Sequence, residues 1–388
     1  MNILLLSQFF STTRGGGEYV FSIIAKKLAE NNHKVFVITN RIEGENYQEH
    51  KNIKVIFVPP VLQYKGGLPP GFSDNIRYTI NAVRQGLKII KDEKIDVIHS
   101  NNFAPALVGS ILSSITSKLH ITTIHDIFSL CGKNYWKKWG RQSDISRMNV
   151  LLAPFFEKLM IKLRCNCIHT VSEATRDDLL KFGTKKPIHV IHNSIESSTI
   201  HNTTPNPLQF VYIGRLVFYK NLEVTIKAVG IARKIEPNIK LVIAGSGPHR
   251  NSLESLVKDL GLHQNIEFRG YVSTEEKSRV ISESNALVFP SLCEGFGLVI
   301  LESFDQSRPV LVSNTRPMSD IVTHRINGFV IDPYDENQWS IHMLDMIKNP
   351  QKSIEMGKSG NELLTKSYNQ NKMYQEIHKM YSDIIKNK

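Results

Sequence analysis

Two cations and two carboxylates in the second half of the chain have the types and spacing to act together. Arg215 and Lys220 lie between a strand-like apolar run and a helical pattern, and Glu294 precedes Glu302 by eight positions. Two fixed cations beside a helix N-terminus can bind a diphosphate and stabilise it as it leaves. Two carboxylates facing one cleft can hold hydroxyl pairs of a ribose and a sugar. The alternatives are a solvated basic turn for the cations, and a helix-capping acid plus a surface glutamate for the carboxylates.

The residues after Glu294 decide where the two carboxylates would lie. Gly295-Phe296-Gly297-Leu298 opens a loop-to-helix segment behind the apolar run from Ala286 to Pro290. A helix that begins near Gly297 leaves Glu294 in the loop at the carboxyl edge of the sheet. Glu302 then lies about one turn inside the helix and faces the same side.

A glycine run near the N-terminus has the composition of a phosphate-binding turn. Gly15, Gly16 and Gly17 lie between the first predicted strand and the helical pattern that starts at Glu18. Glycines let backbone N–H groups approach a ligand closely, and a helix N-terminus favours an anion. The alternative is a turn that needs positive φ. The run does not match Gly-x-Gly-x-x-Gly. It is not a Walker motif either, because the lysine that ends such a motif is missing.

His125 is the one histidine whose position in the pattern predicts a functional role. It follows the apolar run from Ile121 to Ile124 and precedes Asp126. Its imidazole would therefore project from a strand end of the first domain into the same cleft. The alternative is a structural histidine.

The elements that must position these residues form two similar series. Apolar runs of strand length alternate with helical patterns from Asn2 onward, and the alternation restarts at Gln209 after a segment rich in Asn, Thr and Pro. Such alternation predicts parallel sheets with helices on both faces. We therefore expect an α/β protein with a first domain over residues 1–200, a linker over 201–207 and a second domain over 208–365. The amphipathic tail, 366–388, has no strand after it and must dock on structure already built.

In the order of their occurrence, these residues resemble the motifs of the retaining glycosyltransferases of family 4, also called glycosyl transferases group 1. The resemblance covers nearly the whole chain. It implies the GT-B fold, in which two Rossmann-like doubly wound domains face a central cleft and a C-terminal helix crosses back to the first domain. The matching segments are Gly15-Gly16-Gly17-Glu18, Asn32-His33-Lys34-Val35, His125-Asp126, Thr170-Val171-Ser172-Glu173, His192-Asn193-Ser194, Gly214-Arg215-Leu216 with Lys220-Asn221, Ala244-Gly245-Ser246-Gly247-Pro248, and Glu294 with Glu302.

The resemblance implies a role for each position. Arg215 and Lys220 would neutralise the diphosphate of a nucleotide sugar, Glu302 would hold the ribose, and Glu294 would hold hydroxyls of the transferred sugar. His125 would lie beside the anomeric centre. The catalytic set is thus His125, Arg215, Lys220 and Glu294. The donor-binding set adds Gly15, Gly16, Gly17, Gly245, Gly295, Phe296, Gly297, Leu298 and Glu302.

The same resemblance implies metal-independent chemistry without a cofactor. The chain contains no Asp-x-Asp, and its cysteines include no Cys-x-x-Cys. Positive side chains would replace a metal as electrophile. One segment departs from the family pattern: Arg316-Pro317-Met318-Ser319-Asp320 replaces a glycine-rich stretch that ends in Glu. Because this stretch is near the donor, the sequence leaves the donor base and sugar open.

The charge of the chain is concentrated in its first half. Residues 1–195 hold 26 Lys and Arg against 15 Asp and Glu, whereas 196–388 hold 22 against 21. Much of the excess is in 131–166, where aromatic residues alternate with cations, which predicts contact with an anionic membrane surface. A solvated face is the alternative, and nucleic acid ranks behind lipid because no nucleic-acid motif is present. The predicted membrane residues are Lys133, Trp136, Lys137, Lys138, Trp139 and Arg141.

These features favour an enzyme that moves a hexosyl unit from a nucleotide-diphosphate sugar to a lipid-linked or saccharide acceptor. No apolar window is long enough to span a bilayer and the first residues lack a signal-peptide pattern, so we expect a cytoplasmic protein, peripheral at the inner face of the membrane. Two alternatives stay open. One is a sugar-nucleotide epimerase of the same fold, and the other is a non-enzymatic nucleotide-sugar-binding module.

Overall fold

The computed structural model describes residues 1–11, 16–44, 50–63, 70–132, 135–142, 147–201 and 203–387. The chain divides into two compact units. Unit 1 comprises Met1–Trp136, Ser146–Ser194 and Gln370–Lys388, and unit 2 comprises Lys137–Ile145 and Ile195–Asn369. Each unit is built on one parallel sheet, as the alternating pattern predicted.

The sheet of unit 1 has seven parallel strands in the order β3-β2-β1-β4-β5-β6-β7. Because the chain starts in the middle of the sheet and winds outward in both directions, the order reverses between β1 and β4, and this reversal is the ligand-binding edge of doubly wound folds. The strands are β1 (Asn2–Leu6), β2 (Lys34–Ile42), β3 (Ile53–Leu62), β4 (Val97–Ser100), β5 (Leu119–Ile124), β6 (Cys167–Thr170) and β7 (Ile188–Val190).

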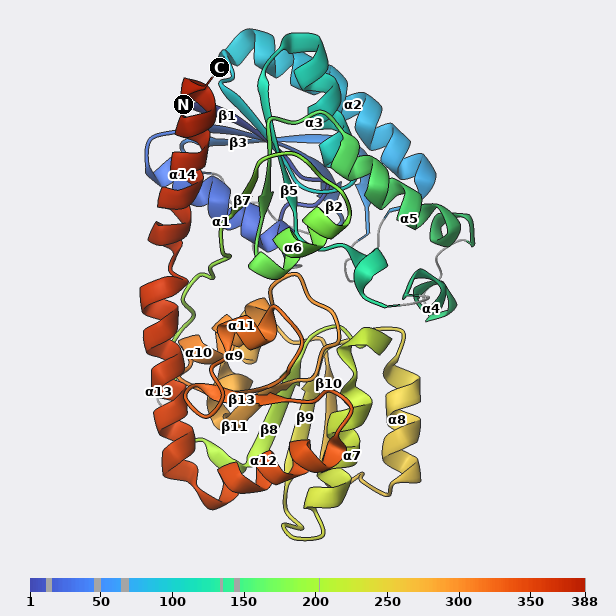
Figure 1. Cartoon of the computed structure of the whole chain (residues 1–388), viewed down its shortest axis with the longest axis vertical. Coiled ribbons are helices and arrows are strands. Elements are labelled where there is room, and N and C mark those ends of the chain that lie inside the picture. The colour runs from blue at the N-terminus through green and yellow to red at the C-terminus, as the bar shows by residue number, and fades with distance from the viewer. Residues whose placement is uncertain are drawn as a thin grey trace. The chain divides into compact units, whose positions relative to one another are not determined.

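Helices cover both faces of this sheet. Helices α2, α3 and α5 lie side by side on one face, while α1 and the C-terminal α14 pack together on the other (Figure 1). Apolar side chains from the strands and from α2 and α3 form the core between the layers. The helices of unit 1 are α1 (Gly17–Glu30), α2 (Phe72–Glu93), α3 (Ala104–Thr116), α5 (Arg147–Lys162), α6 (Glu173–Lys181) and α14 (Gln370–Lys386), with a 3-10 turn η1 (Phe128–Leu130). Helix α4 (Tyr135–Gln142) begins in unit 1 and belongs to unit 2 from Lys137 on.

The sheet of unit 2 repeats this winding with six parallel strands in the order β10-β9-β8-β11-β12-β13. Its reversal lies between β8 and β11, which pair directly. The strands are β8 (Asn206–Ile213), β9 (Lys240–Ala244), β10 (Ile266–Gly270), β11 (Ser284–Phe289), β12 (Val310–Ser313) and β13 (Gly328–Ile331).

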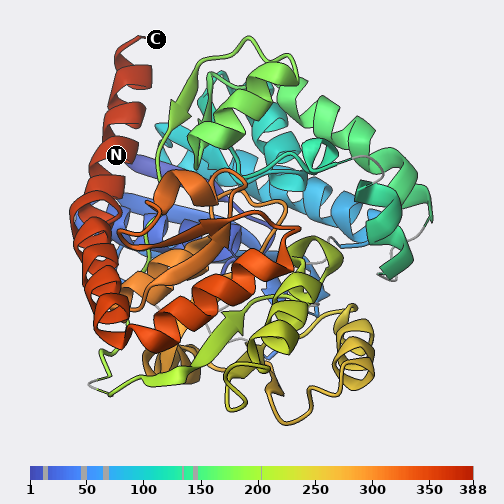
Figure 2. The same ribbon diagram turned by 60° about the horizontal axis from the view of Figure 1, so that its bottom comes forward.

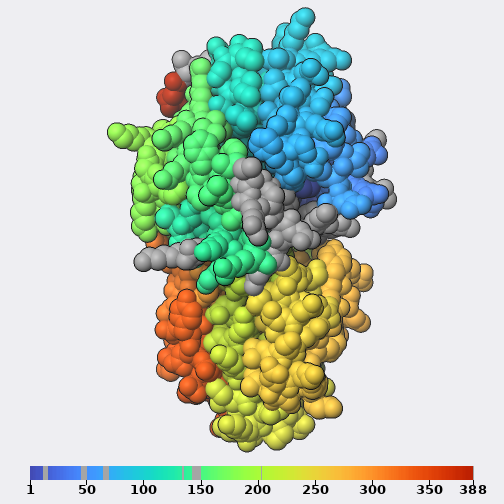
Figure 3. All heavy atoms as spheres, turned by 90° about the vertical axis from the view of Figure 1, so that its right-hand side faces the viewer, coloured from blue at the N-terminus to red at the C-terminus, as the bar shows by residue number. Residues whose placement is uncertain are grey.

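Two helical layers enclose the second sheet as well. Helices α7 and α12 lie side by side on one face, and α10 packs on α9 and α13 (Figure 2). The outer side of α8 forms part of the surface of its unit (Figure 3). The helices are α7 (Leu222–Ala232), α8 (Arg250–Asp259), α9 (Thr274–Glu283), α10 (Leu298–Asp305), α11 (Met318–Ile321), α12 (Glu336–Lys348) and α13 (Pro350–Ser367), with a 3-10 turn η2 (Phe218–Lys220).

The boundary between the units that follows β7 lies at Ser194, before the expected linker at 201–207. Ser198 explains the difference, because its backbone N–H and its hydroxyl donate to the carboxylate of Asp305 at 2.8 and 2.7 Å. The amide of Gln306 donates to the Ser198 hydroxyl and to the carbonyl of Thr199. The segment after Ser194 is therefore fastened to the C-terminal end of α10, within unit 2.

The C-terminal helix α14 belongs to unit 1. Its buried side chains are Met373, Ile377, Met380 and Tyr381. The amphipathic pattern of the tail predicted Ile377, Met380 and Tyr381 on the apolar face, whereas Tyr374 and Ile384, also expected there, are only partly buried. Tyr374 also contacts the ring of His33 near the start of β2. Among the described residues, no helix combines the length and apolarity needed to cross a bilayer.

Candidate active site

The loop after β8 presents the two predicted cations. The strand ends at Ile213, Gly214 turns the chain at φ 153°, and Arg215 follows. Lys220 lies at the end of η2, and Asn221, at φ 55°, stands before the first residue of α7. Both cations thus lie between the carboxyl end of a central strand and a helix N-terminus, where backbone N–H groups also favour an anion.

Glu294 lies in the loop after β11, the neighbour of β8 at the reversal of the sheet. Its carboxylate forms an ion pair with the ammonium group of Lys220, and the two side chains are only 14% and 11% exposed. The ring of Phe289 lies 4.8 Å below the Lys220 nitrogen. One predicted carboxylate and one predicted cation are therefore in direct contact in a largely desolvated place, where electrostatic interactions are strong.

Backbone contacts hold the two loops together. The side-chain amide of Asn221 donates to the carbonyls of Pro290 and Pro333, at 3.3 and 2.7 Å. The carbonyl of Tyr219 accepts from the N–H of Leu292 at 2.8 Å. The bonds to Pro290 and from Leu292 join the loop of Lys220 to the loop of Glu294. The two charged side chains are therefore held close together by these hydrogen bonds as well as by their mutual attraction.

Glu302 lies in α10, one turn beyond its first residue Leu298, as the sequence predicted. Its carboxylate is paired with the ammonium group of Lys277 in α9 at 2.5 Å, and both side chains are less than a quarter exposed. Each of the two predicted carboxylates therefore has its own lysine. The sequence did not point to Lys277, because it lies 25 positions away on another helix and its neighbours form no motif.

Close backbone approaches explain several of the predicted donor-site glycines. A Cβ on Gly245 would overlap the carbonyl oxygen of Gly214, so glycine is required there for the two loops to pack. Gly297, at φ 96°, is the N-cap of α10. Phe296 is buried with its ring 5.8 Å from that of Tyr368, and Gly295 lies between it and Glu294.

Gly17 and His125 meet in unit 1. A Cβ on Gly17 would lie 2.7 Å from Nε2 of His125, which places the N-terminus of α1 against the imidazole. Nε2 is 3.1 Å from Oδ1 of Asn101, an atom that already accepts from the N–H of Asn102. Nε2 therefore carries the proton, and burial, followed by the charge of His169, lowers the pKa of His125 to about 3. The ring is neutral at pH 7. Gly16 is exposed, and Gly15 lies outside the described residues.

A chain of buried hydrogen bonds lies behind His125 and was not predicted from the sequence. His99 contacts the hydroxyls of Tyr381 at 2.6 Å and Thr123 at 2.7 Å, and Thr123 also contacts His169 at 2.9 Å. The far nitrogen of His169 faces the carbonyl of Ile191 at 3.4 Å. Burial lowers the pKa of both histidines, so both rings are neutral at pH 7. A carbonyl only accepts and each neutral ring donates one proton, so the hydrogen bonds run in one direction, from Tyr381 through His99, Thr123 and His169 to Ile191.

Two tryptophans of the predicted membrane stretch, Trp136 and Trp139, contact other protein side chains. Trp139 is 5% exposed and packs 5.8 Å from the ring of Tyr219 in unit 2. The indole N–H of Trp136 donates to Ser129 and Glu157. Lys137, Lys138 and Arg141 are exposed, and Lys133 lies outside the described residues. The expectation that Trp139 would anchor in lipid is therefore wrong, because its ring is already covered by protein.

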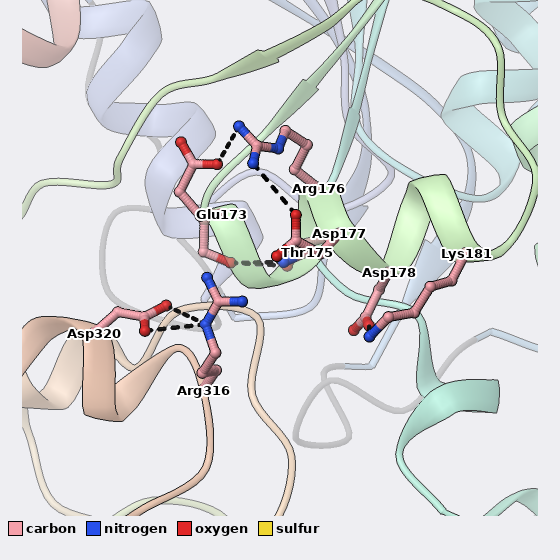
Figure 4. A network of polar contacts seen from close by, with 9 residues as sticks. Glu173, Thr175, Arg176, Asp177, Asp178, Lys181, Arg316 and Asp320 are labelled. Carbon is pink, nitrogen blue, oxygen red and sulfur yellow. Dashed lines mark hydrogen bonds and ion pairs between the residues drawn. The ribbon is translucent and has the colours of Figure 1, made fainter.

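The segment that departs from the family pattern carries an exposed ion pair. Nε of Arg316 contacts both carboxylate oxygens of Asp320, at 3.0 and 2.8 Å (Figure 4). In unit 1, the same figure shows Arg176 paired with Glu173 and Asp177 on the first turns of α6. Among the residues that the structure describes, no group of three or more His, Cys, Asp or Glu side chains could hold a metal ion.

Two family models match the chain. The model for Glycosyltransferase Family 4 matches residues 14–199, and the model for Glycosyl transferases group 1 matches residues 194–363. An uncharacterized glycosyltransferase of Methanocaldococcus jannaschii is 28% identical over 338 residues, which cover 82% of this chain and 82% of the relative. An alpha-monoglucosyldiacylglycerol synthase of Streptococcus pneumoniae is 22% identical over 322 residues, which cover 78% of this chain and 68% of the relative.

Solved structures share the fold. The sucrose-phosphate synthase of Thermosynechococcus elongatus superimposes with a TM-score of 0.83 at 18% identity, covering 100% of both chains. Anabaena HepE in complex with UDP and glucose gives a TM-score of 0.74 at 18% identity, covering 99% of this chain and 100% of the other. The two doubly wound units thus have the GT-B fold.

Proposed function

This chain belongs to the family 4 glycosyltransferases, and we propose that it transfers a hexosyl unit from a nucleotide-diphosphate sugar with retention of the anomeric configuration. The observation that carries the proposal is the grouping of Arg215, Lys220 and Glu294 at the carboxyl edge of β8 and β11. These two strands flank the reversal of the sheet, where doubly wound folds bind nucleotides. Two cations and a carboxylate there fit a diphosphate joined to a polyhydroxyl ring.

In the proposed mechanism the cations act on the leaving group. Arg215 and Lys220 stabilise the negative charge that develops on the diphosphate as the glycosidic bond breaks. The Lys220 ammonium group has three N–H donors, so it can bind a phosphate oxygen while it stays paired with Glu294. Fixed cations supply the charge that a divalent metal supplies in other transferases, so we propose that the reaction is metal-independent.

The proposed contacts with the donor follow from the same geometry. Glu302, oriented by Lys277, holds the ribose hydroxyls, and Glu294 holds hydroxyls of the transferred sugar. The acceptor hydroxyl attacks on the face from which the diphosphate leaves, and a phosphate oxygen takes its proton. The family resemblance supports a role for His125 at the transferred sugar. Its ring is neutral, with Nε2–H directed at Asn101 and a lone pair left on Nδ1.

We propose a lipid-linked or saccharide acceptor and a site of action at the inner face of a membrane. Two relatives support this: one is an alpha-monoglucosyldiacylglycerol synthase, and another, of Staphylococcus aureus, is a poly(ribitol-phosphate) alpha-N-acetylglucosaminyltransferase. The exposed cations Lys137, Lys138 and Arg141 support an anionic surface as partner. Helix α5 adds exposed apolar side chains, among them Leu151 and Phe155, at 76% and 60%.

A thermal-shift panel of UDP- and GDP-sugars tests the donor. A ligand at a hundred times its Kd adds about 2.7 kcal/mol to the free energy of unfolding, so one donor should raise Tm clearly above the others. The Lys220→Ala variant should lose that rise. Transfer with the preferred donor, followed by NMR of the product, should show retention, and activity should survive EDTA. If no nucleotide sugar shifts Tm or is turned over, the proposal is wrong.

Co-sedimentation with anionic liposomes tests the membrane. Simultaneous charge reversal at Lys137, Lys138 and Arg141 should weaken binding, and salt should weaken wild-type binding. The matched control reverses the charge of three other exposed lysines, Lys227, Lys258 and Lys358. Equal binding by both triple variants would show that the stretch does not bind lipid.

A further inference from the structure

The most specific feature that the proposed function leaves unexplained is the burial of Trp139. Trp139 lies on α4, a helix from the first half of the chain. The part of α4 that begins at Lys137 nevertheless belongs to unit 2. On either side of it Lys138 is exposed and Gly140 only partly covered, whereas Trp139 is 5% exposed. Burial of this ring between two less covered neighbours shows that it packs on particular side chains.

Trp139 packs on the residues that hold the first donor-site cation. Its ring lies 5.8 Å from the Arg215 guanidinium carbon, within the range of a cation–π contact, and 5.8 Å from the ring of Tyr219. The Tyr219 hydroxyl accepts a hydrogen bond from the Arg215 guanidinium at 2.9 Å. Tyr219 itself is 4% exposed. Arg215 is therefore held by two nearly buried aromatic side chains.

Tyr219 also connects this cation to the rest of the site. Its carbonyl accepts from the N–H of Leu292, in the loop that carries Glu294, and the next residue is Lys220. An arginine side chain loses rotamer entropy when it is fixed. A guanidinium that is fixed before the donor binds avoids that cost during binding and reaction.

We propose that Trp139 and Tyr219 are positioning residues, which hold the Arg215 guanidinium ready for the diphosphate. The proposal rests on the proposed function, since it assumes that Arg215 binds the diphosphate. It also gives the aromatic residues of the basic stretch a second assignment: Trp139 serves the donor site, whereas the exposed cations beside it remain available to a membrane.

A double-mutant cycle tests the proposal with inorganic pyrophosphate and the nucleoside diphosphates UDP and GDP as probes. Affinity is measured by calorimetry for wild type, Trp139→Ala, Arg215→Ala and the double variant. Trp139→Ala should weaken diphosphate binding about tenfold, the value of one interaction with a charged group. It should cost almost nothing when Arg215 is already absent, because interacting residues are not additive.

Three further variants separate positioning from loss of the helix. Trp139→Phe should restore most of the affinity, because a ring face remains above the guanidinium. Tyr219→Phe should weaken binding with no change of the unfolding temperature beyond a few degrees. Trp136→Ala removes the other indole of α4, which contacts Ser129 and Glu157, and should leave the affinity unchanged.

The outcomes distinguish this proposal from the proposed function. If wild type binds none of the three diphosphates, the assumed role of Arg215 fails and both proposals fall. If wild type binds but Trp139→Ala has no effect, or has the same effect with and without Arg215, only the positioning role is overturned. Equal losses for Trp136→Ala and Trp139→Ala would assign the effect to folding of α4 and would also overturn it.

Discussion

Gly17 packs so closely against His125 that only glycine fits at this position, because a Cβ on Gly17 would lie 2.7 Å from Nε2 of the imidazole. Gly17→Ala must therefore displace either the ring or the start of α1. We expect a loss of kcat/KM of at least tenfold with a change in Tm of only a few degrees. Kinetics and thermal unfolding of the same preparations measure both.

The matched control for this substitution is Gly230→Ala in α7. Gly230 is also helical, and its Cβ would make an ordinary contact of 3.5 Å with Leu262. This variant should keep its activity and unfold at the same or a slightly higher temperature, since alanine favours helix. Unchanged kinetics for Gly17→Ala would show that the position of His125 does not matter for turnover.

Glu294→Ala and Lys220→Ala should each lower kcat by two orders of magnitude or more, because each removes a group proposed to act on the donor. Each variant also leaves the other charge poorly solvated, at a cost of about 1–3 kcal/mol in the free energy of unfolding. Steady-state kinetics with the preferred donor and urea unfolding test the two effects separately.

The exposed ion pair between Arg250 and Glu254 provides the comparison. Its side chains are 38% and 43% exposed, so Glu254→Ala should change neither stability nor turnover by a measurable amount. Near-full turnover in either the Glu294 or the Lys220 variant would show that these residues do not form the donor site.

Lys277→Met should raise KM for the donor more than it lowers kcat. The ammonium group touches Glu302 at 2.5 Å and not the proposed reacting atoms, so its loss should disturb the hold on the ribose. We expect a rise in KM of about tenfold. Arg279→Met, an exposed residue of the same helix, should leave KM unchanged. A larger effect on kcat than on KM would contradict the assignment.

Unit 1 should lose stability as the pH falls below 6.5. Burial lowers the pKa of His120 and of His169 to about 4, and that of His99 well below its usual value of 6.5. Below pH 6.5 the unfolded chain binds these protons and the folded chain does not, so stability is complete above that pH and falls toward pH 4. Each histidine contributes up to about 1.4 kcal/mol per pH unit.

Urea unfolding between pH 7.5 and 4.5 measures this slope. His169→Gln removes one of the buried groups, so its free energy of unfolding should depend less steeply on pH than that of wild type, whatever its value at pH 7.5. A free energy of unfolding that stays constant from pH 7 to pH 5 would show that the histidines are solvated.

Tyr381→Phe should destabilise the protein by about 1–3 kcal/mol, because it deletes the hydroxyl that donates to the buried Nδ1 of His99. Tyr374→Phe is the control on the same helix. Its hydroxyl contacts His33 at 3.2 Å in a more exposed place, so its loss should cost less. Equal effects of the two variants would show that the buried chain of hydrogen bonds adds nothing to stability.

The two parallel sheets and the ends of their strands could be predicted from the amino-acid sequence. Strand-length apolar runs that alternate with helical patterns allow few other folds, because apolar faces must be buried between layers. A strand end fixes where the next residue lies, so Arg215 after β8 and Glu294 after β11 could be placed at one sheet edge from spacing alone. The same reasoning placed His125 after β5.

Contacts between residues far apart in the chain were decided only by the tertiary structure. The pairing of Lys277 with Glu302 and of Tyr381 with His99 depends on how helices pack, and no local pattern encodes such a pairing. Trp139 shows the limit most clearly. Its neighbours are basic and its helix is amphipathic, so the sequence predicted contact with lipid. An aromatic ring packs on whichever side chains fit against it in the folded protein, and the ring of Trp139 packs on Tyr219 and Arg215.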